Sequence, residues 1–108
     1  MQKQELLAEL EDVLTARRDA DPDQSYVASL YKKGLDQILK KVGEESSEVI
    51  IAAKSSDSTA LVKEVADLWF HCMVLLVDRG LSIQDVLHEL DQRFGVSGLE
   101  EKAKRKQG

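Results

Sequence analysis

The sequence contains very little cysteine. Cys72 is the only one among 108 residues, which excludes an intrachain disulfide and gives no indication of an oxidising compartment. We expect its side chain to act as a small buried hydrophobic group rather than as a reactive thiol. The sequence also lacks any Cys/His spacing typical of a zinc site.

Long hydrophobic runs are also absent. The most apolar run covers residues 68–77, is interrupted by His71 and is far shorter than the roughly 20 residues that a membrane-spanning helix needs. Residues 1–14 carry acidic side chains throughout and lack the apolar centre of a signal peptide. We therefore predict a cytoplasmic protein without a membrane partner.

Basic residues are outnumbered by acidic ones. The chain has 15 Lys and Arg against 20 Asp and Glu, which gives a formal net charge of −5. Because binding to nucleic acid requires basic side chains that displace phosphate counterions, this balance argues against a nucleic-acid partner and favours small molecules or proteins. The length predicts a single domain over residues 1–108, with about residues 96–108 as a polar, basic tail.

Hydrophobic spacing predicts helices and no strands. Apolar residues recur every three to four positions, whereas strand-like alternation and internal repeats are absent. Ser25 and the pair Ser82 and Asp85 are expected helix caps, and Gly80 suits the end of a helix. The predicted helices cover about residues 2–18, 25–31, 35–54, 59–79 and 82–95. The fold class is all-α, a bundle of about four to five helices.

The helix predicted over residues 59–79 is apolar on more than one side. A small single chain cannot cover so much apolar surface, so we predict that a second subunit covers it. Trp69 and Tyr31 are interpreted as packing residues rather than as platforms for base stacking. One apolar face of this helix consists of Leu61, Val65, Leu68, Cys72 and Leu76, and further apolar residues lie on other faces at Ala66, Phe70, Met73, Val74 and Val77.

Acidic residues occur at helical spacing on two of the predicted helices. Glu44, Glu45 and Glu48 form an EExxE cluster, and Glu64 and Asp67 form an ExxD pair. Residues three or four apart share one face of a helix, so antiparallel packing would bring Glu45 and Glu48 against the ExxD pair. Converging carboxylates repel unless a cation or protons intervene, and all-oxygen ligands suit Mg²⁺ or Mn²⁺ rather than zinc. Because Mg²⁺ usually keeps positions for phosphate groups, the pattern points to phosphoanhydride chemistry.

Each of these acids could instead belong to a solvated helix face. The metal site is favoured because Glu45 lies at the edge of an apolar stripe, and because Glu64 and Asp67 interrupt an otherwise apolar helix. His71, one turn after Asp67, could be a metal ligand, a substrate contact or a hydrogen-bonded core histidine. Lys41 could be a solvated charge or a cation that binds a polyphosphate beside the metal ion.

The EExxE and ExxD motifs together resemble those of the MazG-like all-α nucleotide pyrophosphatases, whose Mg²⁺ ions are held by such acids. The surrounding sequence is similar to the phosphoribosyl-ATP pyrophosphatase family of histidine biosynthesis over nearly the whole chain. This resemblance implies that phosphoribosyl-ATP is cleaved to phosphoribosyl-AMP and pyrophosphate by a helical homodimer or a dimer of dimers. The segments that carry it are SYVASLYKKGLDQILKKVGEESSEVIIAAK, EVADLWFHCMVLLVDRGLSIQDVLHEL and RFGVSGLEEKAKR.

The resemblance also implies roles for individual residues. Glu44 could complete a second ion or orient the attacking water, and Glu48 is the other candidate for that base. Lys41 would stabilise the departing pyrophosphate, and Ser25 and Tyr26 are further candidates for substrate contact. Four acids take the positions of the main Mg²⁺ ligands: Glu45, Glu48, Glu64 and Asp67.

Two other functions remain alternatives. A housecleaning pyrophosphatase that acts on dNTPs or other nucleoside triphosphates would share the metal site and differ only in its substrate preference. A non-enzymatic helical dimer that binds Mg²⁺ and nucleotide would share the fold but release no pyrophosphate. The flanking segments SYVASLYKKG and RFGVSGLEEKAKR favour the histidine-pathway substrate.

Overall fold

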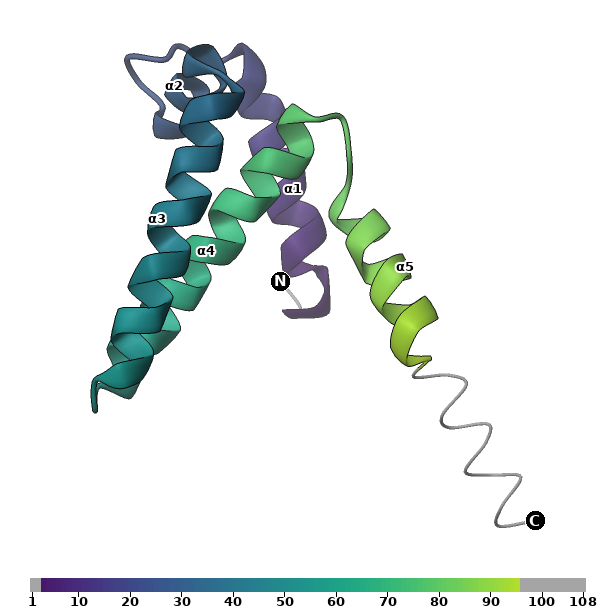
Figure 1. Cartoon of the computed structure of the whole chain (residues 1–108). Coiled ribbons are helices and arrows are strands. Elements are labelled where there is room, and N and C mark those ends of the chain that lie inside the picture. The colour runs from purple at the N-terminus through teal and green to yellow at the C-terminus, as the bar shows by residue number, and fades with distance from the viewer. Residues whose placement is uncertain (1–2, 96–108) are drawn as a thin grey trace, which may run out of the picture.

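The computed structural model describes residues 3–95, and this part of the chain is helical without strands (Figure 1). The predicted all-α class is therefore confirmed, whereas the basic tail expected over residues 96–108 lies outside the described residues. None of the helices between residues 3 and 95 is long and apolar enough to cross a membrane. In chain order the elements are η1 (Lys3–Glu5), α1 (Leu6–Ala16), η2 (Arg17–Asp19), α2 (Tyr26–Lys33), α3 (Leu35–Lys54), α4 (Ser58–Asp78) and α5 (Ile83–Phe94).

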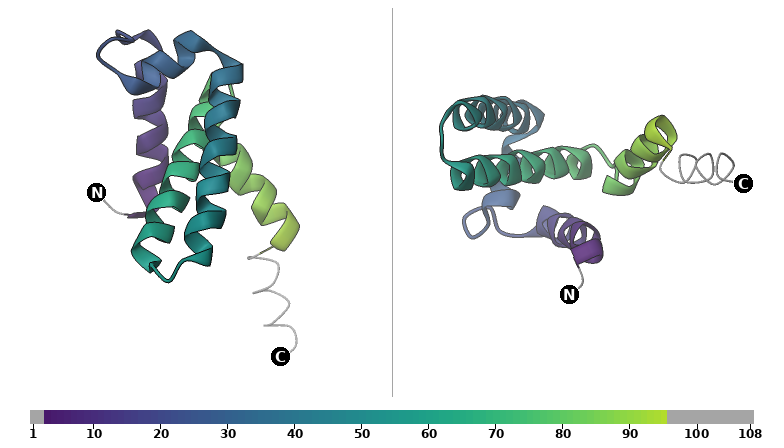
Figure 2. Two further views of the ribbon diagram at one scale, coloured as in Figure 1. Left: turned by 60° about the vertical axis from the view of Figure 1, so that its left-hand side comes forward. Right: turned by 90° about the horizontal axis from the view of Figure 1, so that it is seen from below.

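The two longest helices, α3 and α4, form an antiparallel hairpin and pack against each other along their length (Figures 1 and 2). A short polar turn joins them, and Asp57 caps α4 by accepting a hydrogen bond from the backbone N–H of Ala60 at 3.1 Å. The β-branched residues Ile50 and Ile51 lie inside α3 without interrupting it. The hairpin sets the acids of α3 opposite those of α4.

Several predicted helix boundaries are confirmed by their local contacts. The hydroxyl of Ser25 accepts a hydrogen bond from the N–H of Ala28 at 3.2 Å at the start of α2. Ser82 and Asp85 form the expected capping box at the start of α5. Gly80 follows α4 with φ of +73°, a backbone conformation that glycine adopts at little cost. These signals lie within a few residues of sequence, which is why they could be recognised there.

The hydrophobic core lies where α1 and α2 pack on the hairpin. Tyr31 packs against it and donates a hydrogen bond from its hydroxyl to the carbonyl oxygen of Leu14 at 3.0 Å, so its interpretation as a packing residue is confirmed. This hydrogen bond ties α2 to the end of α1. The buried members of the core are Leu14, Leu30, Ile38, Met73, Val74 and Val77.

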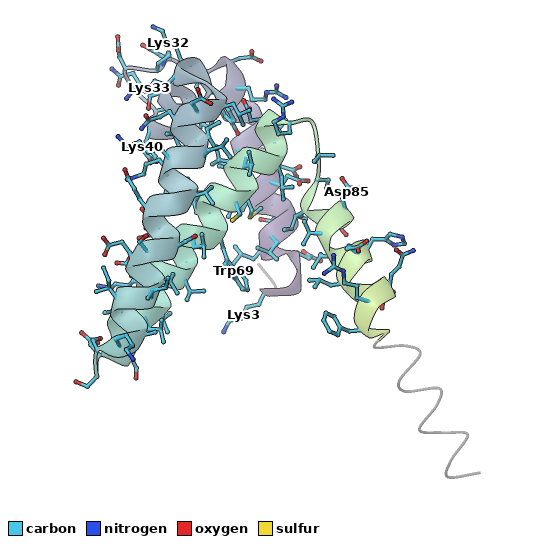
Figure 3. All side chains as sticks on the ribbon, viewed as in Figure 1. Lys3, Lys32, Lys33, Lys40, Trp69 and Asp85 are labelled. Carbon is cyan, nitrogen blue, oxygen red and sulfur yellow. The ribbon has the colours of Figure 1, made fainter. Side chains whose placement is uncertain are left out.

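The most buried face of α4 is formed by Met73, Val74 and Val77, which are almost fully buried. Leu61, Val65, Leu68, Cys72 and Leu76, which share another face, are only partly buried, so the expected burial of Cys72 is only partly met. Trp69 was expected to pack, but 60% of its surface is exposed, on the side of α4 that faces α1 (Figure 3). Because α4 is apolar on more than one side, its sequence could not decide which side meets the core.

Helix α5 is attached to the rest of the fold through a glutamate of α1. One carboxylate oxygen of Glu11 accepts a hydrogen bond from the N–H of Ile83 at 2.6 Å, and the other accepts one from the hydroxyl of Ser82 at 3.1 Å. The negative charge of Glu11 also lies at the positive end of the α5 dipole. The apolar side chains of α5 remain largely exposed: Val86, Leu87, Leu90 and Phe94.

Replacing Glu11 by alanine should release the start of α5. Since two hydrogen bonds to a carboxylate are lost, we expect Glu11→Ala to lower the free energy of unfolding by about 1–3 kcal/mol and to speed amide exchange within α5. Urea denaturation and hydrogen exchange measure both effects. Asp12→Ala is the matched control, because Asp12 is the exposed neighbour of Glu11. Equal losses in the two variants would contradict this role for Glu11.

Candidate metal centre

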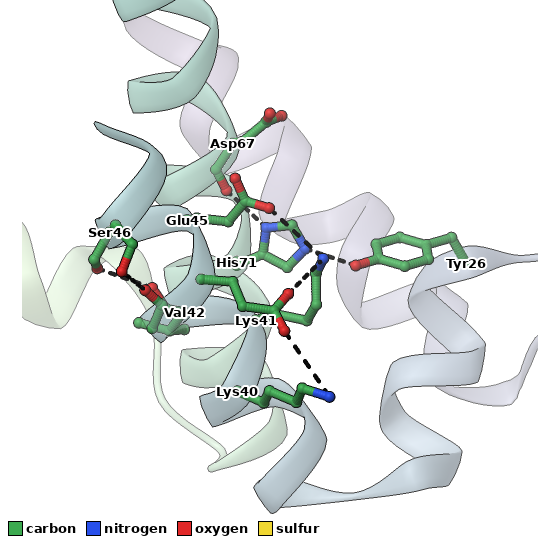
Figure 4. A network of polar contacts seen from close by, with 11 residues as sticks. Tyr26, Lys40, Lys41, Val42, Glu45, Ser46, Asp67 and His71 are labelled. Atoms are coloured by element: carbon green, nitrogen blue, oxygen red, sulfur yellow. Dashed lines mark hydrogen bonds and ion pairs between the residues drawn. The ribbon is translucent and has the colours of Figure 1, made fainter. Parts of the chain in front are cut away.

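Three carboxylates converge across the α3–α4 hairpin. Glu45 of α3 and Glu64 and Asp67 of α4 each offer one oxygen, and these oxygens all lie within 4.8 Å of one another. The side chain of Glu45 is only 13% exposed, as expected for a residue at the edge of the apolar stripe. We call Glu45, Glu64 and Asp67 the acidic trio. Figure 4 shows Glu45 beside Asp67.

Two other predicted site residues lie outside the trio. Glu48, one turn after Glu45, is exposed, although its charge is close enough to act on Glu64. Glu44 is paired with lysines: its carboxylate lies 3.4 Å from the Nζ of Lys41 and 4.0 Å from that of Lys40. The structure therefore brings together three of the four predicted metal ligands and places Glu44 among the neighbouring cations.

The trio carries more negative charge than its surroundings balance. Partial burial raises the pKa of Glu64, and the charges of Asp67, Glu45 and Glu48 and close contact with the Glu45 carboxyl raise it further. A proton or a cation would relieve this repulsion. Three carboxylate ligands with no nitrogen or sulfur donor among them fit a hard divalent ion such as Mg²⁺ or Mn²⁺.

Lys41 lies at the edge of the trio. Its ammonium is 3.7 Å from Glu45 and 3.4 Å from Glu44, and its side chain is 25% exposed. Burial lowers the pKa of Lys41, but Tyr26, Glu44 and Glu45 outweigh this effect and the pKa is raised overall. The side chain therefore stays a cation, in the place where an anionic group bound at the trio would meet it.

His71 is a hydrogen-bonded core histidine, which confirms one of its three interpretations. It is 5% exposed, and its Nδ1 lies 2.7 Å from the backbone carbonyl oxygen of Asp67. Its Nε2 lies 2.8 Å from the hydroxyl of Tyr26 (Figure 4). The sequence singled out both residues but not their contact, because Tyr26 and His71 are on different helices. Edge-to-face contacts with the rings of Phe70 and Tyr26 also hold the imidazole in place.

The two α2 candidates for substrate contact occupy different environments. Ser25 is buried and its hydroxyl caps α2, whereas Tyr26 is 51% exposed. Burial raises the pKa of Tyr26, Lys41 lowers it, and the carboxylates of Glu45, Glu44 and Asp67 raise it. The tyrosine hydroxyl is thus close enough to the site to respond to its charges.

An all-α fold that presents carboxylates from both helices of an antiparallel pair is consistent with the class of MazG-like pyrophosphohydrolases. Residues 7–94 match the family model described as phosphoribosyl-ATP pyrophosphohydrolase. The chain belongs to this family of hydrolases, and the resemblance found in the sequence is confirmed.

Curated relatives agree over almost the whole chain. A phosphoribosyl-ATP pyrophosphatase of Methylococcus capsulatus is 58% identical over 104 residues, which cover 96% of this chain and 99% of the relative. Proteins of the same name from Hydrogenovibrio crunogenus and Nitrosospira multiformis are 55% and 53% identical. Those alignments cover 94% and 100% of this chain and 93% and 89% of the relatives.

Neutralising Glu64 should stabilise the metal-free protein while removing its response to metal. Its pKa is raised in the folded state, so the ionised form destabilises the fold, and this cost grows as pH rises from the ordinary glutamate pKa through the raised one. In EDTA we expect Glu64→Gln to melt above wild type at neutral and higher pH and to match it well below the ordinary glutamate pKa.

Added Mn²⁺ should then raise the melting temperature of wild type but not that of Glu64→Gln, because a ligand stabilises the state that binds it. Thermal unfolding across a pH series, with and without Mn²⁺, measures both effects. Asp12→Asn on α1 is the control and should follow wild type throughout. A metal-free Glu64→Gln protein that is less stable than wild type at neutral pH would contradict the repulsion.

Proposed function

We propose that this protein hydrolyses phosphoribosyl-ATP to phosphoribosyl-AMP and pyrophosphate, the second step of histidine biosynthesis, in a Mg²⁺-dependent reaction. The observation that carries the proposal is the acidic trio beside the ammonium of Lys41, in a chain of this family. The names of the relatives support the choice of substrate. A cytoplasmic location belongs to the same proposal, since a lone cysteine shows no adaptation to an oxidising compartment.

The residues that would hold the ion are Glu45, Glu64 and Asp67, with Glu48 added from the next turn of α3. Mn²⁺ is a possible substitute, because it accepts the same oxygen ligands. When bound, Mg²⁺ offsets the charge of the phosphates and lowers the pKa of a water molecule. The raised pKa of Glu64 supports a cation at this place, because ionisation of all three acids is otherwise opposed.

The side chains around the trio would complete the reaction. Lys41 would move from its carboxylate partners to the departing pyrophosphate and stabilise its charge. Glu44 or Glu48 would orient the attacking water and accept its proton; both are exposed and next to the trio. Of the α2 residues, Tyr26 is better placed than Ser25 for substrate contact, since Ser25 is buried as a helix cap.

Release of pyrophosphate tests the proposal directly. We expect the purified protein with Mg²⁺ to turn over phosphoribosyl-ATP in preference to ATP and a panel of dNTPs, and EDTA to stop the reaction. Asp67→Ala and Glu48→Ala should reduce turnover to background while circular dichroism remains unchanged, and Asp12→Ala should stay active. Preference for dNTPs would indicate a housecleaning enzyme, whereas nucleotide binding without any release would indicate a non-enzymatic module. Full activity in both site variants would contradict the metal assignment.

A homodimer, or a dimer of such dimers, is the second part of the proposal. The residues of α3 and α4 that point away from the core include large apolar side chains: Ile50, Ile51, Val62 and Trp69 are between 60% and 69% exposed. Trp69 also lines an apolar groove of about 330 Å³ that α1, α4 and α5 share. Exposure of this extent is unusual on a monomer, and a second copy with the same apolar surface would cover it.

The dimer can be tested by placing charge on that surface. Val62 and Trp69 lie two turns apart on one side of α4, so Val62→Glu and Trp69→Glu should each convert a dimer into a folded monomer. Light scattering coupled to size exclusion measures the mass. Val13→Glu is the control, because Val13 is also exposed but lies on α1. A monomeric wild type, or equal disruption by all three substitutions, would contradict this interface.

A further inference from the structure

The partly buried contact between His71 and Tyr26 has no role in the mechanism described so far. A polar ring inside a hydrophobic core destabilises the fold unless its nitrogens are hydrogen-bonded. Both nitrogens of His71 are bonded, Nδ1 to the carbonyl oxygen of Asp67 at 2.7 Å and Nε2 to the hydroxyl of Tyr26 at 2.8 Å. One imidazole thus connects the α4 backbone at a trio residue with the first residue of α2.

The carbonyl partner fixes the direction of one hydrogen bond, and in the neutral imidazole this also fixes the direction of the other. The oxygen of Asp67 is a backbone carbonyl and can only accept, so Nδ1 of His71 must carry the proton and donate. A neutral imidazole has one donor and one acceptor, which leaves Nε2 as the acceptor. The hydroxyl of Tyr26 therefore donates its only hydrogen to the neutral imidazole of His71.

This direction decides what Tyr26 can offer to the site. With its hydrogen committed to His71, the tyrosine oxygen has only acceptor lone pairs left for other groups. Acceptor lone pairs repel phosphate oxygens and attract an ammonium. Figure 4 shows the Tyr26 hydroxyl at the same corner of the site as Lys41 and Glu45, and the charge of Lys41 acts on the pKa of Tyr26.

We propose that His71 is a positioning residue that acts through Tyr26 on Lys41. His71 makes the tyrosine oxygen an obligate acceptor, and that acceptor keeps the Lys41 ammonium at the edge of the acidic trio when an anion draws it away from Glu44 and Glu45. The ligand served by this arrangement is a pyrophosphate group bound with a divalent ion. The inference rests on the proposed function only for the role of Lys41 as an anion contact.

Binding of Mn²⁺ and pyrophosphate to the full-length protein tests the inference without any turnover. Tyr26→Phe removes a single oxygen atom, and we expect it to weaken pyrophosphate binding by roughly tenfold, equivalent to about 1.4 kcal/mol, and to leave the affinity for Mn²⁺ alone unchanged. Calorimetry measures the first and electron paramagnetic resonance of Mn²⁺ the second. Tyr31→Phe is the matched control, because it removes the other tyrosine hydroxyl of α2, which donates to the carbonyl oxygen of Leu14 away from the site.

Two substitutions of His71 separate its two hydrogen bonds. In Asn the amide nitrogen replaces Nδ1, so His71→Asn keeps the hydrogen bond to the carbonyl oxygen of Asp67 and loses the hydrogen bond to Tyr26. We expect it to weaken pyrophosphate binding as much as Tyr26→Phe does. In Gln the amide oxygen replaces the acceptor Nε2, so His71→Gln should recover most of the pyrophosphate affinity. The double variant Tyr26→Phe with His71→Asn should be no weaker than either single one, because both remove the same connection.

A Lys41→Met background supplies the decisive comparison. If Tyr26 acts on Lys41, Tyr26→Phe should weaken pyrophosphate binding no further once Lys41 is gone. An equal loss in both backgrounds, an unchanged affinity in Tyr26→Phe, or a parallel loss of Mn²⁺ affinity would each overturn the inference.

Because Tyr26→Phe and Lys41→Met leave the core histidine in place, the test holds even if the His71 variants fail to fold. Failure to hydrolyse phosphoribosyl-ATP would count against the proposed function alone, since this binding experiment needs no turnover.

Discussion

Glu45, Glu64 and Asp67 repel one another, and the packing of the rest of the structure must hold them together against this repulsion. Their oxygens lie within 4.8 Å of one another, and partial burial together with the neighbouring carboxylates raises the pKa of Glu64. Packing two turns further along the hairpin, where Ile38 of α3 and Val74 of α4 join one buried cluster, holds the two helices in place against it. The core thus keeps three charges close together, where only a proton or a cation can relieve them.

Helix α2 contributes residues both to the hydrophobic core and to the surroundings of the acidic trio. Leu30 of α2 is buried in the hydrophobic cluster, while Tyr26, one turn earlier, reaches His71 and the edge of the trio. The Ser25 cap fixes the start of this short helix. A small change in the packing of α2 would therefore change the position of the Tyr26 hydroxyl. The short helix that packs Leu30 into the core therefore also places the hydroxyl of Tyr26 near Lys41.

Features that depend on residues close together in the sequence could be predicted from it, whereas features that depend on how the helices pack could not. Helix ends at Ser25, Gly80 and Ser82 were predictable because capping contacts span a few residues, and the convergence of the acids followed from helical spacing once antiparallel packing was assumed. The buried side of α4 was not predictable, since an all-round apolar helix offers no stripe to choose. Nor was the contact of Tyr26 with His71, which depends on how α2 sits on α4.

The exposed apolar surface and the charged site share one helix, so the proposed association would affect the proposed metal site. On α4, Glu64 and Asp67 lie between Val62 and Trp69 along the sequence, so the segment that carries two trio residues also carries the surface proposed for a second copy. Ligands that bind only the folded chain add their free energies to its stability, and a partner subunit does the same by mass action. A single chain must hold the repelling acids with its small core alone. Covering Val62 and Trp69 would strengthen the fold around the trio without adding any group to it.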